Sequence, residues 1–259
     1  MKPHLSIFNL NKYILPGIPL KIRFTPAPNS FVLTRGAGTD TPKLDILDAK
    51  FYCSFVKATQ GQHLAVMQSV LTKPVHYENT YVTAKTFAVA AGSESVTLDN
   101  IYMGPIPNRI LMVMVADDAL GGTYGTNPFN FQHFNLKSLA IMVNSKMIPN
   151  PPYEPSFAAG GQYLRTYAGM LEGLNKMFSE HPIPLSPKDF KGGYAIWPFD
   201  LTPDQNCERS HSPQGHGNIR ILVRFATGLT AAIVLCLLAE YDAWIEIDKY
   251  KNVTTSFNQ

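Results

Sequence analysis

The last quarter of the chain, Asn218 to Val253, limits the possible folds more than any other stretch. Residues 219–225 place isoleucine, valine and phenylalanine at the odd positions, with Arg220 and Arg224 on the opposite side. This period of two predicts a strand with one buried face. Residues 231–247 are almost continuously apolar, which is typical of a strand buried on both faces or of a core helix, and β-branched and aromatic residues near the end favour the strand. The two segments together predict the centre of a β-sandwich.

The composition agrees with a chain of many short strands. The 259 residues include 20 prolines and 18 glycines spread along the sequence, together with 15 phenylalanines and 12 tyrosines that suit packing on sheets. With 45% hydrophobic and 16% charged residues, the chain is not disordered and can bury a substantial core, as one large all-β domain or two ordinary ones.

Charge is distributed unevenly along the chain. Residues 1–70 contain eight Lys and Arg against three Asp, and the remainder contains 14 basic against 16 acidic residues, so the net charge of +3 divides into +5 and −2. The basic residues of the first part are dispersed at strand-like spacing, which favours outward-facing solvated positions over a phosphate-facing surface. Because the net charge is small, we expect no specific nucleic-acid site.

Three strand candidates occupy the first part of the chain, at residues 18–24, 31–33 and 44–56. They would form a small sheet with one apolar face, which needs a second layer to be stable. A helical turn is expected around residues 64–71, and the boundary between two units is expected at residues 72–74.

The remainder of the chain predicts further strands and one helix. The expected strands before the final pair are residues 75–90, 95–98, 109–115, 134–147 and 194–201. The strand at 134–147 is expected to stop at the proline-rich residues 149–155, because proline lacks the N–H that a central strand donates. An amphipathic helix is expected near 161–180, packed as a lid on the sandwich rather than serving as a partner-binding or membrane helix.

The three cysteines, Cys53, Cys207 and Cys236, lack the spacing of a metal site. Cys53 and Cys236 lie in apolar strand candidates, where a thiol is usually a small core hydrophobe. The odd number of cysteines and the lack of an apolar run at the start predict reduced thiols in a protein that folds inside the cell. No segment suggests a membrane span.

Few residues suggest site chemistry. Cys207, His211 and His216 share one loop and are the candidates for a metal site, but no second ligand pair accompanies them, so a solvated loop is the preferred interpretation. Asp117 and Asp118 follow a buried strand and either bind a hard cation or end the strand at the surface, and the second interpretation is preferred. No nucleophile elbow, protease signature or paired acid and base is present, so we expect no catalytic residues, no cofactor and no enzymatic activity.

Several strings of residues carry more information than these patterns. They are, in order, FNLNKYILPGIPLKIRF, KLDILDAKFYCSFVK, VTLDNIYMGPIPNRI, NPFNFQHFNLKSLAIMVN, GYAIWPFDLTPD and AEYDAWIEIDKYKNV. In this order they resemble the hexon-like major capsid proteins of Polinton/Maverick elements and adintoviruses. The combination of residues 98–100, 127–131, 199–204 and 245–248 is more specific than any single motif.

The resemblance implies a double jelly roll, in which two eight-stranded sandwiches stand side by side and three subunits form a pseudo-hexagonal capsomer. It implies self-association as a homotrimer and a capsid lattice, contact with a minor capsid protein, and a place in the virion capsid. It also implies synthesis in the host cytoplasm and assembly there or in the nucleus. The family has no catalytic residues to carry over.

This sequence differs from the family at the beginning of the chain. Family members carry a long segment before the part that matches residues 8–13. Residues 1–73 therefore correspond to the closing strands of an incomplete first jelly roll, residues 74–253 to a complete jelly-roll domain, and residues 254–259 to a tail. The apolar faces within residues 5–57 would then lack a partner sheet.

Two alternatives to a capsid protein remain open. A domesticated host jelly-roll protein could act as a ligand- or carbohydrate-binding module, with aromatic residues of the loop 121–132, such as Tyr124, contacting the ligand. A jelly-roll metalloenzyme would rest on Cys207, His211 and His216.

Overall fold

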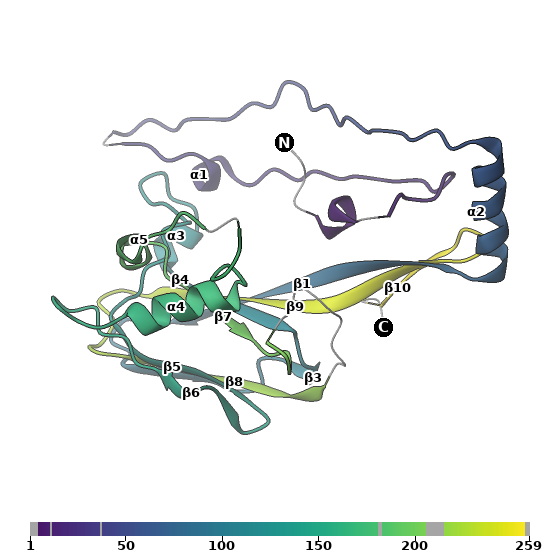
Figure 1. Ribbon diagram of the computed structural model, residues 1–259. Coiled ribbons are helices and arrows are strands. Elements are labelled where there is room, and N and C mark those ends of the chain that lie inside the picture. The colour runs from purple at the N-terminus through teal and green to yellow at the C-terminus, as the bar shows by residue number, and fades with distance from the viewer. Residues whose placement is uncertain (1–4, 11, 37, 181–182, 206–214, 257–259) are drawn as a thin grey trace. The chain divides into compact units, whose positions relative to one another are not determined.

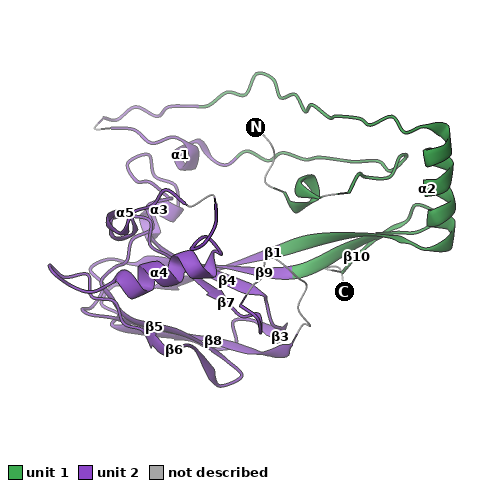
Figure 2. Cartoon of the chain, in the orientation of Figure 1, with its two compact units in different colours: residues 1–26, 44–81, 242–259 green, residues 27–43, 82–241 purple. Residues whose placement is uncertain are grey.

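A computed structural model describes residues 5–10, 12–36, 38–180, 183–205 and 215–256 (Figure 1). The chain divides into two compact units (Figure 2). The first consists of Met1–Pro26, Leu44–Tyr81 and Asp242–Gln259, and the second consists of Ala27–Lys43 and Val82–Tyr241.

The helices are short and the strands dominate. In chain order the elements are η1 (Ser6–Asn9), α1 (Asn29–Val32), α2 (Gln60–Thr72), β1 (Val75–Val89), β2 (Ser95–Leu98), β3 (Met103–Pro105), β4 (Arg109–Ala116), α3 (Asp117–Leu120), β5 (Leu136–Val143), β6 (Lys146–Tyr153), α4 (Leu164–Gly173), α5 (Pro187–Gly192), β7 (Ile196–Asp200), β8 (His216–Phe225), β9 (Ile233–Ile247) and β10 (Val253–Thr255).

The strand order identifies the fold as a jelly roll. One sheet has the order β1-β9-β4-β7 and the other has the order β2-β8-β5-β6, while the short strands β3 and β10 add to β8 and β9. The pairing is nested, because β1 pairs with β9, β2 with β8, β4 with β7 and β5 with β6, and these pairs alternate between the two sheets. A chain of eight strands rolled up in this way is a jelly-roll sandwich. The antiparallel jelly-roll fold expected for the larger part of the chain is confirmed.

Side chains from both sheets form the core. Met112 of β4 lies opposite Leu237 of β9 and Trp197 of β7, and Ile141 of β5 lies opposite Ile221 of β8. None of these five side chains is more than 1% exposed, and all belong to one cluster of buried residues. Burial of such a side chain stabilises the fold by about 1.5–3 kcal/mol.

The last quarter of the chain forms the two strands expected from its pattern. In β8, Ile219, Ile221 and Val223 are buried while Arg220 and Arg224 are exposed, so the prediction of one buried face is confirmed. The strand β9 has neighbours on both sides, β1 and β4. The expected strand is confirmed, but from Leu235 to Ala239 buried residues alternate with partly buried ones, so one face lies in the core and the other is only partly covered.

The strands expected at 18–24, 31–33 and 44–56 are wrong, because the described residues before Val75 contain no strand. Most of these residues follow an extended course without sheet pairing, and residues 31–32 end α1 instead. Strand propensity alone cannot hold a strand whose backbone N–H and C=O groups have no partner. The apolar side chains remain exposed, as expected for a sheet without a second layer: Phe24 is 68% and Phe55 93% exposed. Cys53, expected in a core, is exposed for the same reason.

The helical turn expected at 64–71 is confirmed as part of the longer helix α2. Thr59 and Gln62 form a capping box at its start, and the helix ends before Lys73-Pro74. The expected boundary at 72–74 falls between α2 and β1, whereas the compact units divide within β1, after Tyr81, and within β9, after Tyr241.

The prediction of one strand over residues 134–147 is also wrong, because these residues form a hairpin. Strands β5 and β6 are joined by Asn144 and Ser145, whose φ angles of 47° and 73° are those of a tight hairpin turn. The proline-rich segment that was expected to break the strand is part of β6. Prolines are tolerated there because β6 is the edge of its sheet, where N–H donors are not needed on both sides.

The amphipathic helix is confirmed as α4, although it is shorter than residues 161–180. It ends at Gly173, and Asn175 adopts a φ of 52° two residues later. Its buried residues are Thr166, Gly169, Met170 and Gly173, and it packs against β7, which confirms the expected lid. The apolar residues Leu164 and Phe178 are 63% and 94% exposed instead of buried. No helix within the described ranges is long and apolar enough to cross a membrane.

Candidate functional site

The hypothesis of a metal site rests on three residues, and the structure describes one of them. His216 begins β8, is exposed, and lies opposite Pro105 of β3. Its backbone carbonyl accepts a hydrogen bond from Asn144 Nδ2 at 3.1 Å. Cys207 and His211 lie outside the described residues. Among the residues that are described, no three His, Cys, Asp or Glu side chains are placed to hold a metal ion.

Asp117 and Asp118 lie where the chain leaves the sheet. The strand β4 ends at Ala116, and the two exposed aspartates form the first turn of α3. Acidic side chains at a helix N-terminus are stabilised by the helix dipole. This placement agrees with the interpretation of the pair as the polar end of a buried strand.

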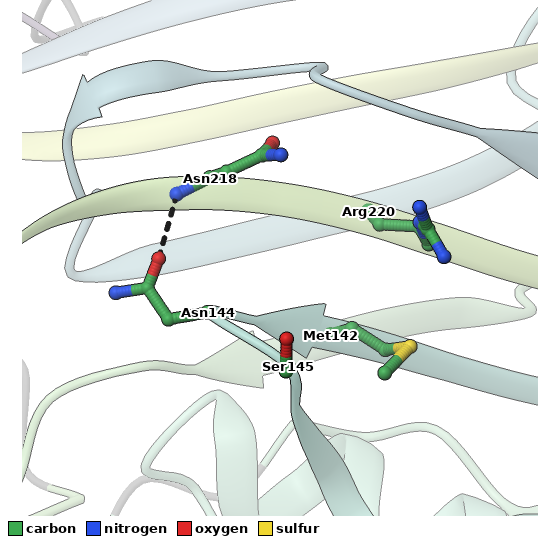
Figure 3. Close-up of a pocket in the computed structure, with 5 residues that line it drawn as sticks. All are labelled: Met142, Asn144, Ser145, Asn218 and Arg220. Atoms are coloured by element: carbon green, nitrogen blue, oxygen red, sulfur yellow. Dashed lines mark hydrogen bonds between the residues drawn. The ribbon is translucent and has the colours of Figure 1, made fainter.

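A hollow in the second unit has a volume of about 410 Å³ and is lined by Met142, Asn144, Ser145, Asn218 and Arg220 (Figure 3). It lies where the β5–β6 turn approaches β8. The backbone N–H of Asn218 donates to Asn144 Oδ1 at 2.9 Å, and the backbone N–H of Asn144 donates to the Asn218 carbonyl at 3.1 Å. These bonds close the hairpin onto β8.

The charged side chain among these lining residues, Arg220, forms an ion pair with Asp99. The Asn218 side chain donates to Asn100, the next residue of the same turn. The polar groups of Asn144, Asn218 and Arg220 are therefore bonded to one another or to neighbouring residues outside the hollow, and its lining residues contain no acid–base pair of the kind that catalysis needs. The arrangement holds strand ends together.

A second cluster joins two parts of the chain about ninety residues apart in sequence, and both parts belong to the second unit. We call residues 27–43 the strap and residues 121–131 the socket. The backbone N–H of Arg35 donates to the Tyr124 carbonyl at 2.8 Å, and the Tyr124 hydroxyl donates to the Pro42 carbonyl at 3.1 Å. The Arg35 guanidinium lies 5.7 Å from the centre of the Tyr124 ring.

The strap also contacts the socket through aromatic and backbone packing. Phe31 meets Phe129 edge-on with ring centres 5.8 Å apart, and Phe129 meets Phe131 in the same manner at 6.3 Å. Gly122 has a φ of +78°, and a side chain there would lie 3.2 Å from Ser30 Oγ and 3.3 Å from the backbone nitrogen of Phe31. Only glycine fits this backbone conformation and this close approach comfortably. The aromatic residues of the socket are evident in the sequence, but no pattern there indicates their partner.

A stack of aromatic rings begins at His133, two residues after the socket. The His133 imidazole lies 3.8 Å from the Phe157 ring and nearly parallel to it, and Phe157 in turn lies 5.6 Å from Tyr163. His133 Nδ1 accepts a hydrogen bond from the backbone N–H of Asn135 at 3.0 Å. Burial lowers the pKa of His133, and the positive charge of Lys191 lowers it further. The imidazole is therefore neutral in the folded state near pH 7, as the accepted hydrogen bond requires.

Polar residues of the strings that carry the resemblance close turns, Asp200 at the end of β7 and Asn127 within the socket. Asp200 Oδ1 accepts from the backbone N–H of Thr202 at 2.9 Å, and Asn127 Oδ1 accepts from the backbone N–H of Phe129 at 2.9 Å. Each is a local turn closed by a side chain.

Asp248 closes the turn between β9 and β10 in the same way. Its carboxylate accepts from the backbone N–H groups of Tyr250 and Asn252, each at 2.8 Å, and from Asn252 Nδ2 at 2.9 Å. Desolvation opposes ionisation of Asp248, but the hydrogen bonds from Asn252 and Tyr250 and the charge of Lys249 outweigh it and lower its pKa. The polar residues of these matching strings therefore stabilise turns of the fold.

Comparison with known proteins gives one sequence relative and several solved structures. No family model matches the chain. The uncharacterized protein F54H12.2 of Caenorhabditis elegans is 20% identical over 254 residues, a match that covers 96% of this chain and 60% of the relative. The chain thus spans about 60% of the length of the curated relative that it matches.

Several similar solved structures are of viruses or of viral capsid proteins. A chain of the Sputnik virophage is 15% identical, with a TM-score of 0.42, and the match covers 71% of this chain and 39% of the other. A chain of the PBCV-1 virus capsid is 11% identical, with a TM-score of 0.41, covering 71% and 52%. The mavirus major capsid protein is 12% identical, with a TM-score of 0.38, covering 71% and 41%. The identification of the jelly roll rests on the strand order described above.

Proposed function

We propose that this chain is a structural protein, a hexon-like major capsid subunit or part of one, that assembles as trimeric pseudo-hexagonal capsomers in a virion capsid. Synthesis in the host cytoplasm, assembly there or in the nucleus, and contact with a minor capsid protein belong to the same proposal. Because a fold alone does not determine a function, the proposal needs support from particular residues.

The observation that carries the proposal is the role of the residues that resemble hexon-like capsid proteins. Asp99, Asn127, Asp200 and Asp248 each bond a neighbouring strand or close a local turn. A polar residue kept for catalysis would instead face a cleft, with its acid–base partner within hydrogen-bond reach. We therefore propose a structural and non-enzymatic role, and metal analysis of the purified chain is expected to find no stoichiometric zinc.

The exposed apolar residues of the first part of the chain give further support. Leu47 and Phe55 are 97% and 93% exposed, and Tyr52 is 87% exposed, all within 44–56. Monomeric proteins rarely leave such a series of large apolar side chains in water, and proteins that assemble cover them with a partner. We propose that residues 1–73, whose described part forms no strand in the single chain, belong to an incomplete first jelly roll and that a partner covers their apolar side chains in the assembly.

The alternative of a carbohydrate-binding module is not favoured by any contact of Tyr124. That side chain donates a hydrogen bond to Pro42, and its ring lies beside the Arg35 guanidinium. Its hydroxyl and its ring therefore already contact residues of the same chain.

Electron microscopy of the purified protein tests the proposal. Pseudo-hexagonal rings of three subunits, or lattices built from them, are expected. Monomeric particles across the micromolar range, at neutral pH and physiological salt, would count against a capsid function.

A further inference from the structure

We propose that residues 45–57, which we call the docking segment, pair antiparallel with the same residues of a second copy of this chain. The inference rests on the proposed capsid function and deepens it, because it names the partner that covers these side chains. It also fixes the residue on which the two copies are centred, Phe51.

Every residue of the docking segment is exposed, although the segment is rich in large apolar side chains. It runs into α2 within the first unit and contains no helix and no strand (Figure 2). Phe51 contacts Phe8 with ring centres 5.6 Å apart, yet it is still 42% exposed. The contact within the chain therefore leaves part of the central ring, and the side chains on both sides of it, for a partner.

The order of residues in the docking segment is complementary to itself. In an extended chain, alternate residues share one face. On the face of Phe51, an acid stands at one end, a base at the other, and nonpolar residues between them. In order, the residues of this face are Asp45, Leu47, Ala49, Phe51, Cys53, Phe55 and Lys57.

Two antiparallel copies centred on Phe51 match these residues in pairs. Asp45 of one copy then lies opposite Lys57 of the other, because each is six residues from the centre. Leu47 lies opposite Phe55, and the two-fold axis repeats both pairs at the other end. Residues directly opposite in an antiparallel pair have Cβ atoms about 4.5–5.5 Å apart, so the apolar side chains pack and the charges meet.

The charges of the docking segment select this partner and this register. In the described part of the chain, neither Asp45 nor Lys57 forms an ion pair, and twelve residues of extended chain hold them about 40 Å apart. A second copy in reversed direction brings them together at both ends. Moving the register by two residues places Lys50 opposite Lys50 in one direction and Lys57 opposite Leu47 in the other, and like charges directly opposite are destabilising.

The symmetry of the contact gives its place in the assembly. A contact between identical segments is isologous and has a two-fold axis, whereas the contacts that close a trimer are heterologous. The docking segment therefore joins subunits of different capsomers. A two-stranded pair is marginally stable by itself, and a capsomer that carries three such segments gains avidity.

Disulfide trapping tests the register. The pairing places Ala49 opposite Cys53 of the other copy, with Cα atoms about 4.5–5.5 Å apart, which a disulfide can bridge. Within one extended chain the same two positions are about 13 Å apart and cannot be bridged. In a glutathione redox buffer, we expect Ala49→Cys to form at least about tenfold more linked dimer than the control that combines Ala49→Cys with Cys53→Ser.

Mass spectrometry of the linked peptides must show position 49 joined to Cys53. Equal dimer yields in the two proteins, or a link between two copies of Cys53 instead, would overturn the inference. Because the substituted positions are exposed, the fold should be retained, and amide protection in β8 and β9 checks it.

Charge reversal tests the pairing by a second route. Asp45→Lys and Lys57→Asp each place like charges opposite each other at both ends, and a mixture of the two variants restores opposite charges between chains. At low salt we expect the mixture to associate about tenfold more tightly than either variant alone, measured by sedimentation velocity. As a control, Lys21→Asp, exposed outside the docking segment, should give no gain when it is mixed with Asp45→Lys.

The same samples separate this inference from the proposed capsid function. Trimers that show no gain on mixing and no link between positions 49 and 53 would overturn the docking and keep the capsid function. Linked pairs in a protein that forms no trimer would overturn the trimeric capsomer and keep the docking.

Discussion

Gly173 at the end of α4 gives the sharpest test of how the helix is held on the sandwich. A Cβ atom at this position would lie 2.9 Å from Pro198 Cγ and 3.0 Å from both Cβ and the carbonyl oxygen of Pro198. All three atoms belong to a proline ring or to backbone, and Pro198 is part of β7, so none can move aside easily. Gly173→Ala must therefore push the helix away from the strand.

The size of the effect follows from two opposing contributions. Overpacking costs about 1–3 kcal/mol, and replacing glycine by alanine in a helix returns up to about 1 kcal/mol. We expect Gly173→Ala to lower the free energy of unfolding by about 1–2 kcal/mol, and the Tm by roughly 2–4 °C for each kcal/mol.

Gly192 provides a matched control, because it is also the last residue of a helix, α5, and a Cβ there would meet nothing within 4 Å. Gly192→Ala should be neutral or slightly stabilising. Denaturant unfolding of both variants measures the difference. Equal stabilities would show that α4 does not pack on β7 through a glycine face.

Three other predictions concern the core, the ring stack and the hairpin. Met112→Ala should cost about 2–5 kcal/mol of unfolding free energy because the side chain is fully buried, whereas Leu164→Ala, at a 63% exposed position, should change it by less than about 0.5 kcal/mol. Because the pKa of His133 is lowered in the folded state, the unfolded chain binds the proton more tightly, so stability should fall as the pH falls below about 6.5. The part of this loss due to His133 should vanish in His133→Phe, and unfolding midpoints measured at pH 7.5 and 5.5 in both proteins check it; an unchanged slope would contradict the assignment. Asn144→Ala should cost about 1–2 kcal/mol, since it removes two side-chain hydrogen bonds and leaves alanine at positive φ, while Lys146→Ala, exposed on the neighbouring strand, should be nearly neutral in the same denaturation assay.

The jelly-roll strands could be predicted because their residues carry the burial pattern themselves. The alternation in β8 reflects one buried face, and the continuous apolar run of β9 reflects one buried face and one partly buried face. Such patterns are local, so sequence alone is sufficient to find them.

The elements that were missed depend on neighbours that a sequence does not display. The strands expected in the first part of the chain require a partner sheet, and the prolines of β6 are acceptable only because that strand lies at an edge. In α4, Gly169 and Gly173 are buried at positions where Tyr153 and Pro198 leave no room for a side chain, while Tyr167, Leu171 and Leu174 of the expected apolar side are partly buried against the core. The Asn144-Ser145 turn escaped notice because its second residue is not the glycine that such turns favour.

The contacts of the candidate site could not be predicted from the sequence for the same reason. Tyr124 was noted as an aromatic residue of its loop, yet its partners Arg35 and Pro42 lie far away in sequence and share no pattern with it. Contacts of this kind between two loops follow from the path of the chain, which only the structure provides.

Sedimentation velocity of the purified wild-type chain across the micromolar range tests the central claim most directly. We predict a species with three times the 28.7 kDa mass of the chain, together with larger assemblies that increase with concentration. A single species of 28.7 kDa at every concentration would contradict the account of this jelly roll as a capsid subunit.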